Sequence, residues 1–261
     1  HDPYSPPRKL RPPVPAGVRS AIATGDIHEL AMRINAHGAA PLDDVELGYL
    51  RALYDADIAA WDAELARLLD ALAARGLRDS TILVILADHG EEFQDHGKLK
   101  HGIHLYEELI HVPLVIAGPG ITPGRTATQV QGIDLFPTIA TLLGASTPAG
   151  LPGQDILAEP AERPAFSETR YGVAPDGSSG RLRSIRTAAW KLIEATASGQ
   201  AELFDLAHDP GERQDRFVDG ADGSALAREL AHFEATAPPP PAAVAADPNL
   251  HEKLRALGYV E

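Results

Sequence analysis

Residues 81–90 read TILVILADHG, a short apolar run that breaks into Asp88, His89 and Gly90. A continuous apolar run of this length after a helical pattern is typical of a buried parallel strand in an α/β fold. In such sheets, ligands bind at the carboxyl ends of strands, where loops carry polar groups on a rigid frame. The sequence therefore predicts an α/β fold with a ligand site immediately after this strand.

Helical and strand patterns continue on both sides of this run. Between residues 43 and 75, apolar side chains recur at steps of three and four, which predicts one long amphipathic helix. Residues 111–117 (HVPLVIA) predict a second strand, and residues 134–143 predict a helix with a proline in its first turn. The many prolines among residues 1–19 favour an extended surface loop instead.

After Gly150 the pattern changes to short β-like pieces that predict a small antiparallel sheet. These pieces fall at residues 165–168, 182–186, 190–194 and 202–206. Three more elements are expected, namely a helix over 224–236, a polyproline stop at 238–241 and a short helix over 249–257. The predicted architecture is a mainly parallel sheet flanked by helices in residues 1–150, followed by a small antiparallel subdomain with terminal helices in residues 151–261.

The composition excludes several functional classes. The 261 residues carry a formal net charge of −14, which argues against a nucleic-acid partner because a phosphate backbone selects a basic face. No apolar run approaches the roughly 20 residues of a membrane span. The chain has no cysteine, so disulfides, thiolate zinc sites and a cysteine nucleophile are absent. An anionic small substrate would need a local positive centre, such as a bound metal.

The segment after the first strand is rich in histidine, since five of the 11 histidines fall within residues 89–111. Carboxylate oxygen suits hard divalent ions and imidazole suits zinc, manganese or iron, so Asp88 and His89 together indicate a metal site. The alternative is that Asp88 caps a turn and His89 is an ordinary surface residue. The triplet alone leaves both interpretations open.

The longer segment of residues 87–120, ADHGEEFQDHGKLKHGIHLYEELIHVPLVIAGPG, resembles the C-terminal metal-site segment of the sulfatase family, within the alkaline phosphatase superfamily. Other stretches of similar appearance are HDPYSPP at residues 1–7, the helix of residues 54–76, GIDLFPTIATLLG at 132–144, RTAAWKLIEA at 186–195 and AELFDLAHDPGE at 201–212. The resemblance implies an alkaline phosphatase-like fold, truncated at its N-terminus, and a metal-dependent hydrolase of sulfate esters or of related phosphate or phosphonate esters. It also implies a periplasmic or secreted location, with the signal peptide outside this chain.

The resemblance assigns roles residue by residue. Asp88 matches the family's metal-ligand aspartate and His89 the adjacent ligand position, which implies one divalent ion, with calcium, manganese and zinc all open. His101 stands 12 residues after His89, where members commonly place a lysine that binds the anion and helps the leaving group depart. Lys100 is beside it, so either side chain can take that role. His1 matches the substrate-loop histidine that contacts the sulfate or phosphate group.

The family's nucleophile has no match in this sequence. The resemblance requires a formylglycine made from Cys or Ser in a Cys/Ser-x-Pro-x-Arg motif, or a Ser or Thr in the phosphatase branches. The pattern x-x-Pro-x-Arg occurs only at residues 4–8 and 121–125, and neither stretch begins with Cys or Ser. The N-terminal aspartates of the family's metal shell also lack a match. We therefore expect the C-terminal portion of a sulfatase-type hydrolase, inactive as an isolated chain.

Two alternatives stay open at this point, a non-catalytic remnant or module that binds anions or a partner, and a phosphotransferase of the same superfamily. The substrate expected in the leading interpretation is a small anionic ester, and its organic group and the oligomeric state are not indicated. Among the other polar residues of the segment, His96 and His104 are expected to be structural or solvated. Tyr106 and Glu107 are expected to fix the start of a helix.

Overall fold

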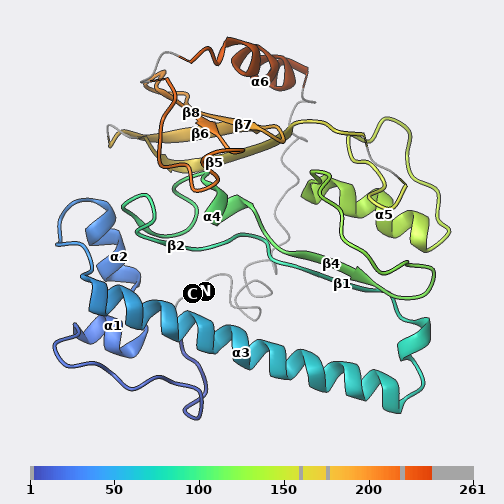
Figure 1. The fold of residues 1–261 in the computed structure, drawn as a ribbon, viewed down its shortest axis with the longest axis horizontal. Helices are drawn as coiled ribbons and strands as arrows, with labels where there is room; N and C mark the ends of the chain where they lie inside the picture. The colour runs from blue at the N-terminus through green and yellow to red at the C-terminus, as the bar shows by residue number, and fades with distance from the viewer. Residues whose placement is uncertain (1–2, 159–160, 175–176, 218–220, 237–261) are drawn as a thin grey trace, which may run out of the picture.

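The computed structural model describes residues 3–158, 161–174, 177–217 and 221–236 (Figure 1). His1, the polyproline stop at 238–241 and the helix predicted over 249–257 lie outside the described residues. Helices of the amino-terminal part lie along one side of the molecule, and a four-stranded sheet lies on the other (Figure 1). The histidine-rich segment runs between them.

The amino-terminal part is built from three helices, α1 (Ser20–Thr24), α2 (His28–Asn35) and α3 (Asp44–Ala74). The long helix predicted over 43–75 is confirmed by α3. Its start is fixed by Asp43, whose carboxylate accepts hydrogen bonds from the backbone N–H groups of Val45 and Glu46. The helices α1 and α2 were not predicted, because residues 20–35 are too short and too mixed for a clear helical repeat.

A first hydrophobic core joins these helices to the histidine-rich segment. Its buried members are Tyr4, Ile22, Ile27, Ala31, Ile34, Leu42, Tyr49, Leu50, Leu53, Phe93 and Leu99. Tyr4 is fully buried although it lies in the proline-rich loop, so that loop is anchored to the core rather than only draped over it. The amino-terminal half of α3 is therefore the packed half.

The two predicted strands of this part exist, but their relationship differs from the prediction. After the short 3-10 helix η1 (Arg78–Ser80), β1 (Leu83–Leu86) pairs antiparallel with β4 (Leu114–Ala117). The expectation of a mainly parallel sheet is thus not confirmed by the described strands. The reason is that no crossover helix lies between the two strands, so the chain turns back beside β1.

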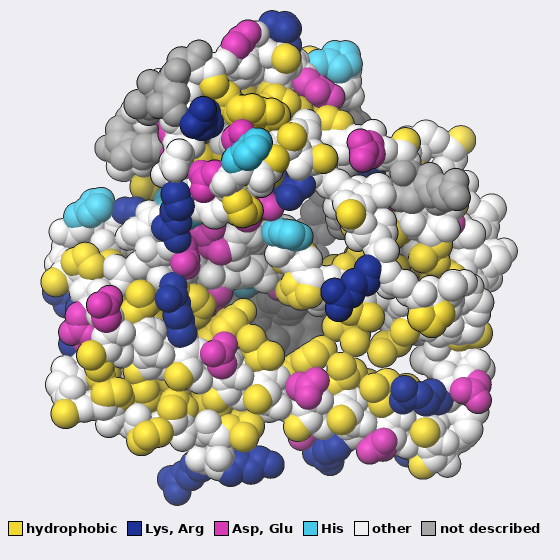
Figure 2. Space-filling model, viewed as in Figure 1, with side chains coloured by type: hydrophobic (Ala, Val, Ile, Leu, Met, Phe, Trp, Pro, Cys, Tyr) yellow, Lys and Arg dark blue, Asp and Glu magenta, His cyan; other side chains and the backbone are white. Residues whose placement is uncertain are grey.

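Several large apolar side chains near this pair are half-exposed. They are Ile58, Trp61 and Leu68 on α3, Leu86 on β1 and Val115 on β4. Figure 2 shows hydrophobic side chains gathered over α3 and over the β1–β4 pair on the face turned to the viewer. The carboxyl-terminal half of α3 and the strand pair therefore present apolar surface that the described residues do not cover.

Between β1 and β4 the chain forms a hairpin and one helical turn. The hairpin consists of β2 (Glu92–Phe93) and β3 (Leu99–Lys100), and the turn is α4 (Glu107–Ile110). Glu92 pairs with Lys100, and Phe93 pairs with Leu99. Strands of two residues carry no readable alternation, which explains why the hairpin was not predicted.

The carboxyl-terminal sheet confirms the predicted antiparallel pieces. The strands β5 (Ala165–Val173), β6 (Ser179–Arg186), β7 (Trp190–Ala195) and β8 (Ala201–Asp205) pair in chain order. The helix α6 (Ser224–Thr236), predicted over the same residues, packs on one face through Leu230, and residues 105–110 pack on the other (Figure 1). The 3-10 helix η2 (Gly132–Asp134) and α5 (Leu135–Leu142) precede this sheet and confirm the helix predicted over 134–143.

Among the described helices, none has both the length and the apolar character needed to cross a membrane.

Candidate functional site

The candidate site begins where β1 ends. The Asp88 carboxylate points into solvent, with its side chain 90% exposed, and one of its oxygens lies 3.7 Å from Nε2 of His89. Nδ1 of His89 lies 2.8 Å from the carbonyl oxygen of Gly90. A carbonyl only accepts, so Nδ1 carries the proton in this contact and Nε2 is the nitrogen with a lone pair in the neutral ring.

These two side chains fit a divalent ion as a partial ligand set. An oxygen and an imidazole nitrogen 3.7 Å apart can share one ion, since metal–ligand distances are about 2.0–2.6 Å. The bond from Nδ1 to a backbone carbonyl is the support that metal-binding histidines commonly have. Within the described residues no group of three or more His, Cys, Asp or Glu side chains is arranged to hold a metal.

Gly90 fixes the backbone directly after the pair. Its N–H donates to the carbonyl of Leu109 at 2.8 Å, which ties the turn to α4. A Cβ atom at position 90 would lie 1.8 Å from the carbonyl oxygen of Glu108, a distance that no side chain can occupy. Only glycine therefore fits, and the turn that carries Asp88 and His89 is held against a helix.

His101 lies against this pair. Its ring stacks on the ring of His89, with centroids 3.8 Å apart and an angle of 25° between the planes. Nδ1 of His101 lies 2.9 Å from a carboxylate oxygen of Glu91, whose side chain is buried. The structure thus brings together three of the residues selected from the sequence, namely Asp88, His89 and His101.

Lys100 is turned in another direction. Its Nζ lies 2.8 Å from Nδ1 of His28, the first residue of α2, on the exposed surface. Its backbone has a φ of 73°, in the left-handed region that a non-glycine residue rarely adopts. Of the two neighbours considered for one role, His101 is the side chain in contact with the Asp88–His89 pair. His1, the fifth selected residue, lies outside the described residues.

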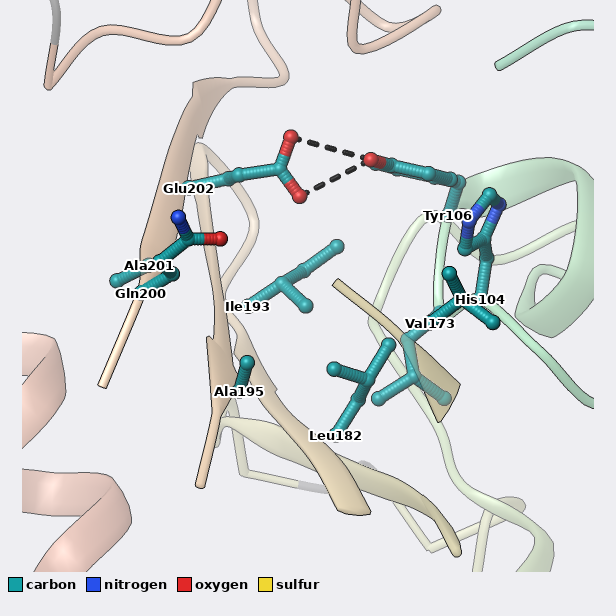
Figure 3. A pocket seen from close by; sticks show the side chains of 10 residues that line it. His104, Tyr106, Val173, Leu182, Ile193, Ala195, Gln200, Ala201 and Glu202 are labelled. Atoms are coloured by element: carbon teal, nitrogen blue, oxygen red, sulfur yellow. Dashed lines mark hydrogen bonds between the residues drawn. The ribbon is translucent and has the colours of Figure 1, made fainter. Parts of the chain in front are cut away.

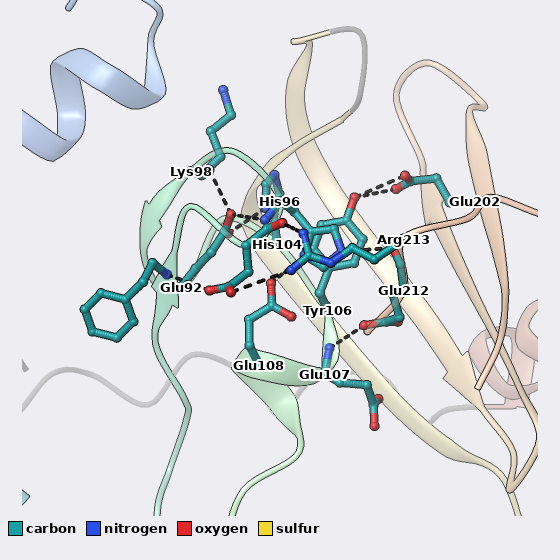
Figure 4. A network of polar contacts seen from close by, with 12 residues as sticks. Glu92, His96, Lys98, His104, Tyr106, Glu107, Glu108, Glu202, Glu212 and Arg213 are labelled. Atoms are coloured by element: carbon teal, nitrogen blue, oxygen red, sulfur yellow. Dashed lines mark hydrogen bonds and ion pairs between the residues drawn. The ribbon is translucent and has the colours of Figure 1, made fainter. Parts of the chain in front are cut away.

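The two histidines expected to be structural or solvated, His96 and His104, belong to a separate buried network (Figure 4). His104 contacts the fully buried carboxylate of Glu92 at 2.8 Å. Nδ1 of His96 lies 2.6 Å from Glu108, and its Nε2 lies 2.9 Å from the carbonyl oxygen of Glu212. Burial opposes the charged form of His96, but the contacts with Glu108 and Glu212 outweigh it and raise the pKa of the ring. Both histidines thus make polar contacts inside the fold.

Tyr106 and Glu107 do more than start a helix. Tyr106 is the residue before α4, and Glu107 forms ion pairs with Arg186 at 3.0 Å and with the buried Lys191 at 3.2 Å. Burial would raise the pKa of Glu107, but these two cations outweigh burial and lower it. Both residues therefore attach the segment that carries the site to the carboxyl-terminal sheet.

A small cavity lies next to this attachment (Figure 3). It measures about 10 Å³ and is lined by side chains that include His104, Tyr106, Ile193 and Glu202. This volume holds about one water molecule and no ester substrate. This cavity is therefore too small to be the candidate site.

Three contributors to the site's surroundings were missed by the sequence reasoning, namely Glu91, Tyr4 and His28. The only signal for Glu91 was its position two residues after His89 in DHGEE. Tyr4 and His28 reach the segment from 87 and 72 residues away, a pairing that no local pattern reveals.

Comparison with known proteins places these residues in a family context. Residues 8–145 match the family model described as Sulfatase, and residues 95–232 match the one described as N-sulphoglucosamine sulphohydrolase, C-terminal. Arylsulfatase K of Mus musculus is 33% identical over 182 residues, which are 64% of this chain and 32% of the relative. Choline-sulfatase of Rhizobium meliloti (strain 1021) is 32% identical over 167 residues, 62% of this chain and 32% of the relative.

A solved structure supports the same likeness. The phosphonate monoester hydrolase of Agrobacterium radiobacter superposes with a TM-score of 0.67 at 27% identity, covering 90% of this chain and 55% of that chain. The chain spans about a third of the length of the curated relatives it matches. The match to the solved structure covers both the helical part and the carboxyl-terminal sheet.

Proposed function

The chain belongs to the sulfatase family, and from that premise we propose that it forms one wall of a metal-dependent active site that hydrolyses sulfate esters. The observation that carries the proposal is the stacking of His101 on His89, with the Asp88 carboxylate 3.7 Å from the His89 ring nitrogen. The end of strand β1 thus carries the Asp88 carboxylate and two imidazoles. In this proposal the imidazole of His89 binds the metal and that of His101 carries the proton. Exposure suits a site that must admit a substrate.

Each residue has a distinct role in this proposal. Asp88 and His89 hold one divalent ion, either calcium, manganese or zinc, and such an ion supplies positive charge that stabilises charge developing on the ester oxygens. His101 donates a proton to the leaving oxygen, because imidazole exchanges protons near neutral pH. His1 is proposed to contact the anionic group of the substrate, whereas Lys100, whose Nζ lies 2.8 Å from Nδ1 of His28, is not given this role.

The remaining machinery is proposed to come from residues outside this chain. Hydrolysis needs an oxygen nucleophile and further acidic metal ligands, and an Asp-His pair by itself leaves most coordination positions to water. The isolated chain is accordingly proposed to be inactive and to bind metal weakly. We also place the complete protein in the periplasm or outside the cell, as expected of the family.

The names of the relatives support the proposed class of ester. The names arylsulfatase and choline-sulfatase favour a sulfate ester, while the phosphonate monoester hydrolase keeps phosphonate and phosphate esters in view. The substrate is thus proposed to be a small anionic ester. Its organic group is left open.

The test uses a full-length protein that contains this chain. Hydrolysis of an aryl sulfate, a phosphate monoester, a phosphate diester and a phosphonate monoester is measured with calcium, manganese and zinc in turn. We expect the sulfate to be cleaved fastest and Asp88→Ala to abolish the activity, while Asp79→Ala, an exposed aspartate in η1, retains it. Equal rates for Asp88→Ala and wild type would refute the site. Binding without turnover of any ester would favour the non-catalytic module, and transfer to an alcohol would favour the phosphotransferase.

A further inference from the structure

We propose that Glu91 is a positioning residue for His101 and that Tyr4 holds Glu91 in place. The inference rests on the proposed function, in which His101 donates the proton to the leaving group. It adds two residues that the family resemblance did not select. The three side chains form a chain of contacts from the hydrophobic core to the candidate site.

The hairpin itself sets Glu91 opposite His101. Glu92 and Lys100 are paired across β2 and β3, so the residue before β2 and the residue after β3 face each other. Lys100 and Gly102, the neighbours of His101, both have left-handed φ angles, of 73° and 85°. Left-handed backbone at a lysine is strained, and here it coincides with the side chain that reaches the Asp88–His89 pair.

Both oxygens of the Glu91 carboxylate are engaged. Oε1 lies 2.9 Å from Nδ1 of His101, and Oε2 accepts a hydrogen bond from the Tyr4 hydroxyl at 2.8 Å. The Glu91 side chain is 2% exposed, so water does not compete for these contacts. An ionised carboxylate only accepts, which makes Nδ1 of His101 the donor. The tautomer and the ring orientation of His101 are thereby fixed together.

Tyr4 makes the anchor rigid. It is fully buried, and its ring packs edge-on against Tyr54 at 5.7 Å and tilted against Phe93 at 6.0 Å. Its backbone N–H donates to the carbonyl of Gly25 at 2.9 Å. These contacts hold the Tyr4 ring and its hydroxyl in place. The hydrogen bond from this hydroxyl in turn orients the Glu91 carboxylate.

The chemical consequence concerns the other ring nitrogen. With Nδ1 committed to Glu91, a proton that His101 gives to a substrate must leave from Nε2. In the proposed step, sulfur forms its bond to an oxygen nucleophile, the bond to the leaving oxygen breaks with its electron pair on that oxygen, and the proton moves from Nε2 to it. The contact with the Glu91 carboxylate thus sets which nitrogen of His101 faces the substrate.

The test measures Glu91→Gln in the full-length enzyme with two sulfate esters, one with a poor alkoxide leaving group and one with a nitrophenolate leaving group. A poor leaving group needs the proton, and a nitrophenolate does not. We expect kcat for the poor leaving group to fall roughly 10- to 100-fold, a part of what general acid catalysis supplies, with KM and metal content unchanged. For the nitrophenyl ester we expect a loss below about threefold. Glu229→Gln, an exposed glutamate in α6, is the matched control.

A second variant and a spectroscopic measurement guard against a simple folding defect. Tyr4→Phe keeps the buried ring and removes only the hydroxyl, and we expect a smaller loss with the same dependence on the leaving group. Nitrogen-15 NMR at alkaline pH, where the His101 ring is neutral, is expected to give the Nδ1–H tautomer in wild type and a mixture in Glu91→Gln. Equal losses on both esters, or no loss on either, would overturn the proposal.

Failure of the proposed function has its own signature. If the wild type hydrolyses no ester, the proposed function is wrong, and the NMR measurement alone decides whether Glu91 positions His101. The Nδ1–H tautomer in wild type together with its loss in Glu91→Gln supports the positioning. A mixed tautomer already present in wild type refutes it.

Discussion

The phenol of Tyr106 donates to the carboxylate of Glu202, with Oη 3.0 Å from one oxygen and 3.1 Å from the other (Figure 3). The contact joins the residue before α4 to strand β8, 96 residues later in the chain. Burial raises the pKa of Tyr106, and the neighbouring Glu202 raises it further, so the phenol stays a donor at all physiological pH values. The segment that carries the candidate site is thus fastened to the carboxyl-terminal sheet by a buried polar bond.

Tyr106→Phe is expected to weaken this attachment. The substitution keeps the ring and leaves the largely buried Glu202 carboxylate without its donor, which costs about 1–3 kcal/mol of unfolding free energy. Urea unfolding measures the loss, and Tyr171→Phe, at a tyrosine that is 82% exposed, is expected to change little. A loss below about 0.5 kcal/mol in Tyr106→Phe would show that water replaces the phenol without penalty.

Glu202→Gln is expected to stabilise the protein, and increasingly so as the pH rises. Burial raises the pKa of Glu202, so its contribution to stability is present below the unfolded pKa of about 4.3 and is lost as the pH rises through the higher folded pKa. The amide still accepts from Tyr106 and cannot ionise. The urea midpoint of Glu202→Gln should exceed that of wild type by an amount that grows between pH 4 and 8. The midpoint of Glu229→Gln should differ from that of wild type by the same amount at every pH.

The sequence predicted elements with long or regular patterns and missed those defined by distant pairing. The helix α3 repeats its apolar residues over 31 positions, and the strands β6 to β8 carry clear apolar character, so both were found. The mainly parallel sheet is not confirmed by β1 and β4, which pair antiparallel, because an apolar run of four residues looks the same in either direction. Direction is set by the connection, which here lacks a crossover helix.

The residues of the candidate site divide in the same way, into those that local sequence features indicate and those that only distant contacts bring in. Asp88, His89 and His101 could be selected because a strand end and a spacing are local features, and the structure brings them together. Glu91 and Tyr4 could not, because their contact depends on a two-residue hairpin and on a residue 87 positions away. Lys100 illustrates the limit of spacing, since its left-handed backbone turns it toward His28.

Metal addition is expected to stabilise the folded chain through Asp88 and His89. An ion at 100 times its dissociation constant adds about 2.7 kcal/mol when it binds only the folded state. Thermal unfolding with millimolar calcium, manganese or zinc should show an increase in Tm that a chelator reverses, and the ion with the largest increase identifies the preference. Asp88→Ala should remove the increase and Asp79→Ala should keep it. An equal increase in Asp88→Ala would place the ion elsewhere.

Gly90→Ala is expected to damage both the fold and the metal response, because the obstacle at position 90 is backbone. The new Cβ would lie 1.8 Å from the carbonyl oxygen of Glu108 and 3.2 Å from Cα of Leu109, and no rotation of a side chain relieves that overlap. The turn must move away from α4, carrying His89 with it, at a cost of about 1–3 kcal/mol.

The control for this substitution is Gly48→Ala, at an exposed position within α3, where a Cβ meets nothing within 4 Å. Alanine favours the helix there, so we expect a gain of up to about 1 kcal/mol. Urea unfolding and the metal-induced increase in Tm are measured on both variants. If Gly90→Ala unfolds like wild type and keeps its metal response, α4 yields easily, and the close approach at Gly90 is not what holds the Asp88–His89 pair in place.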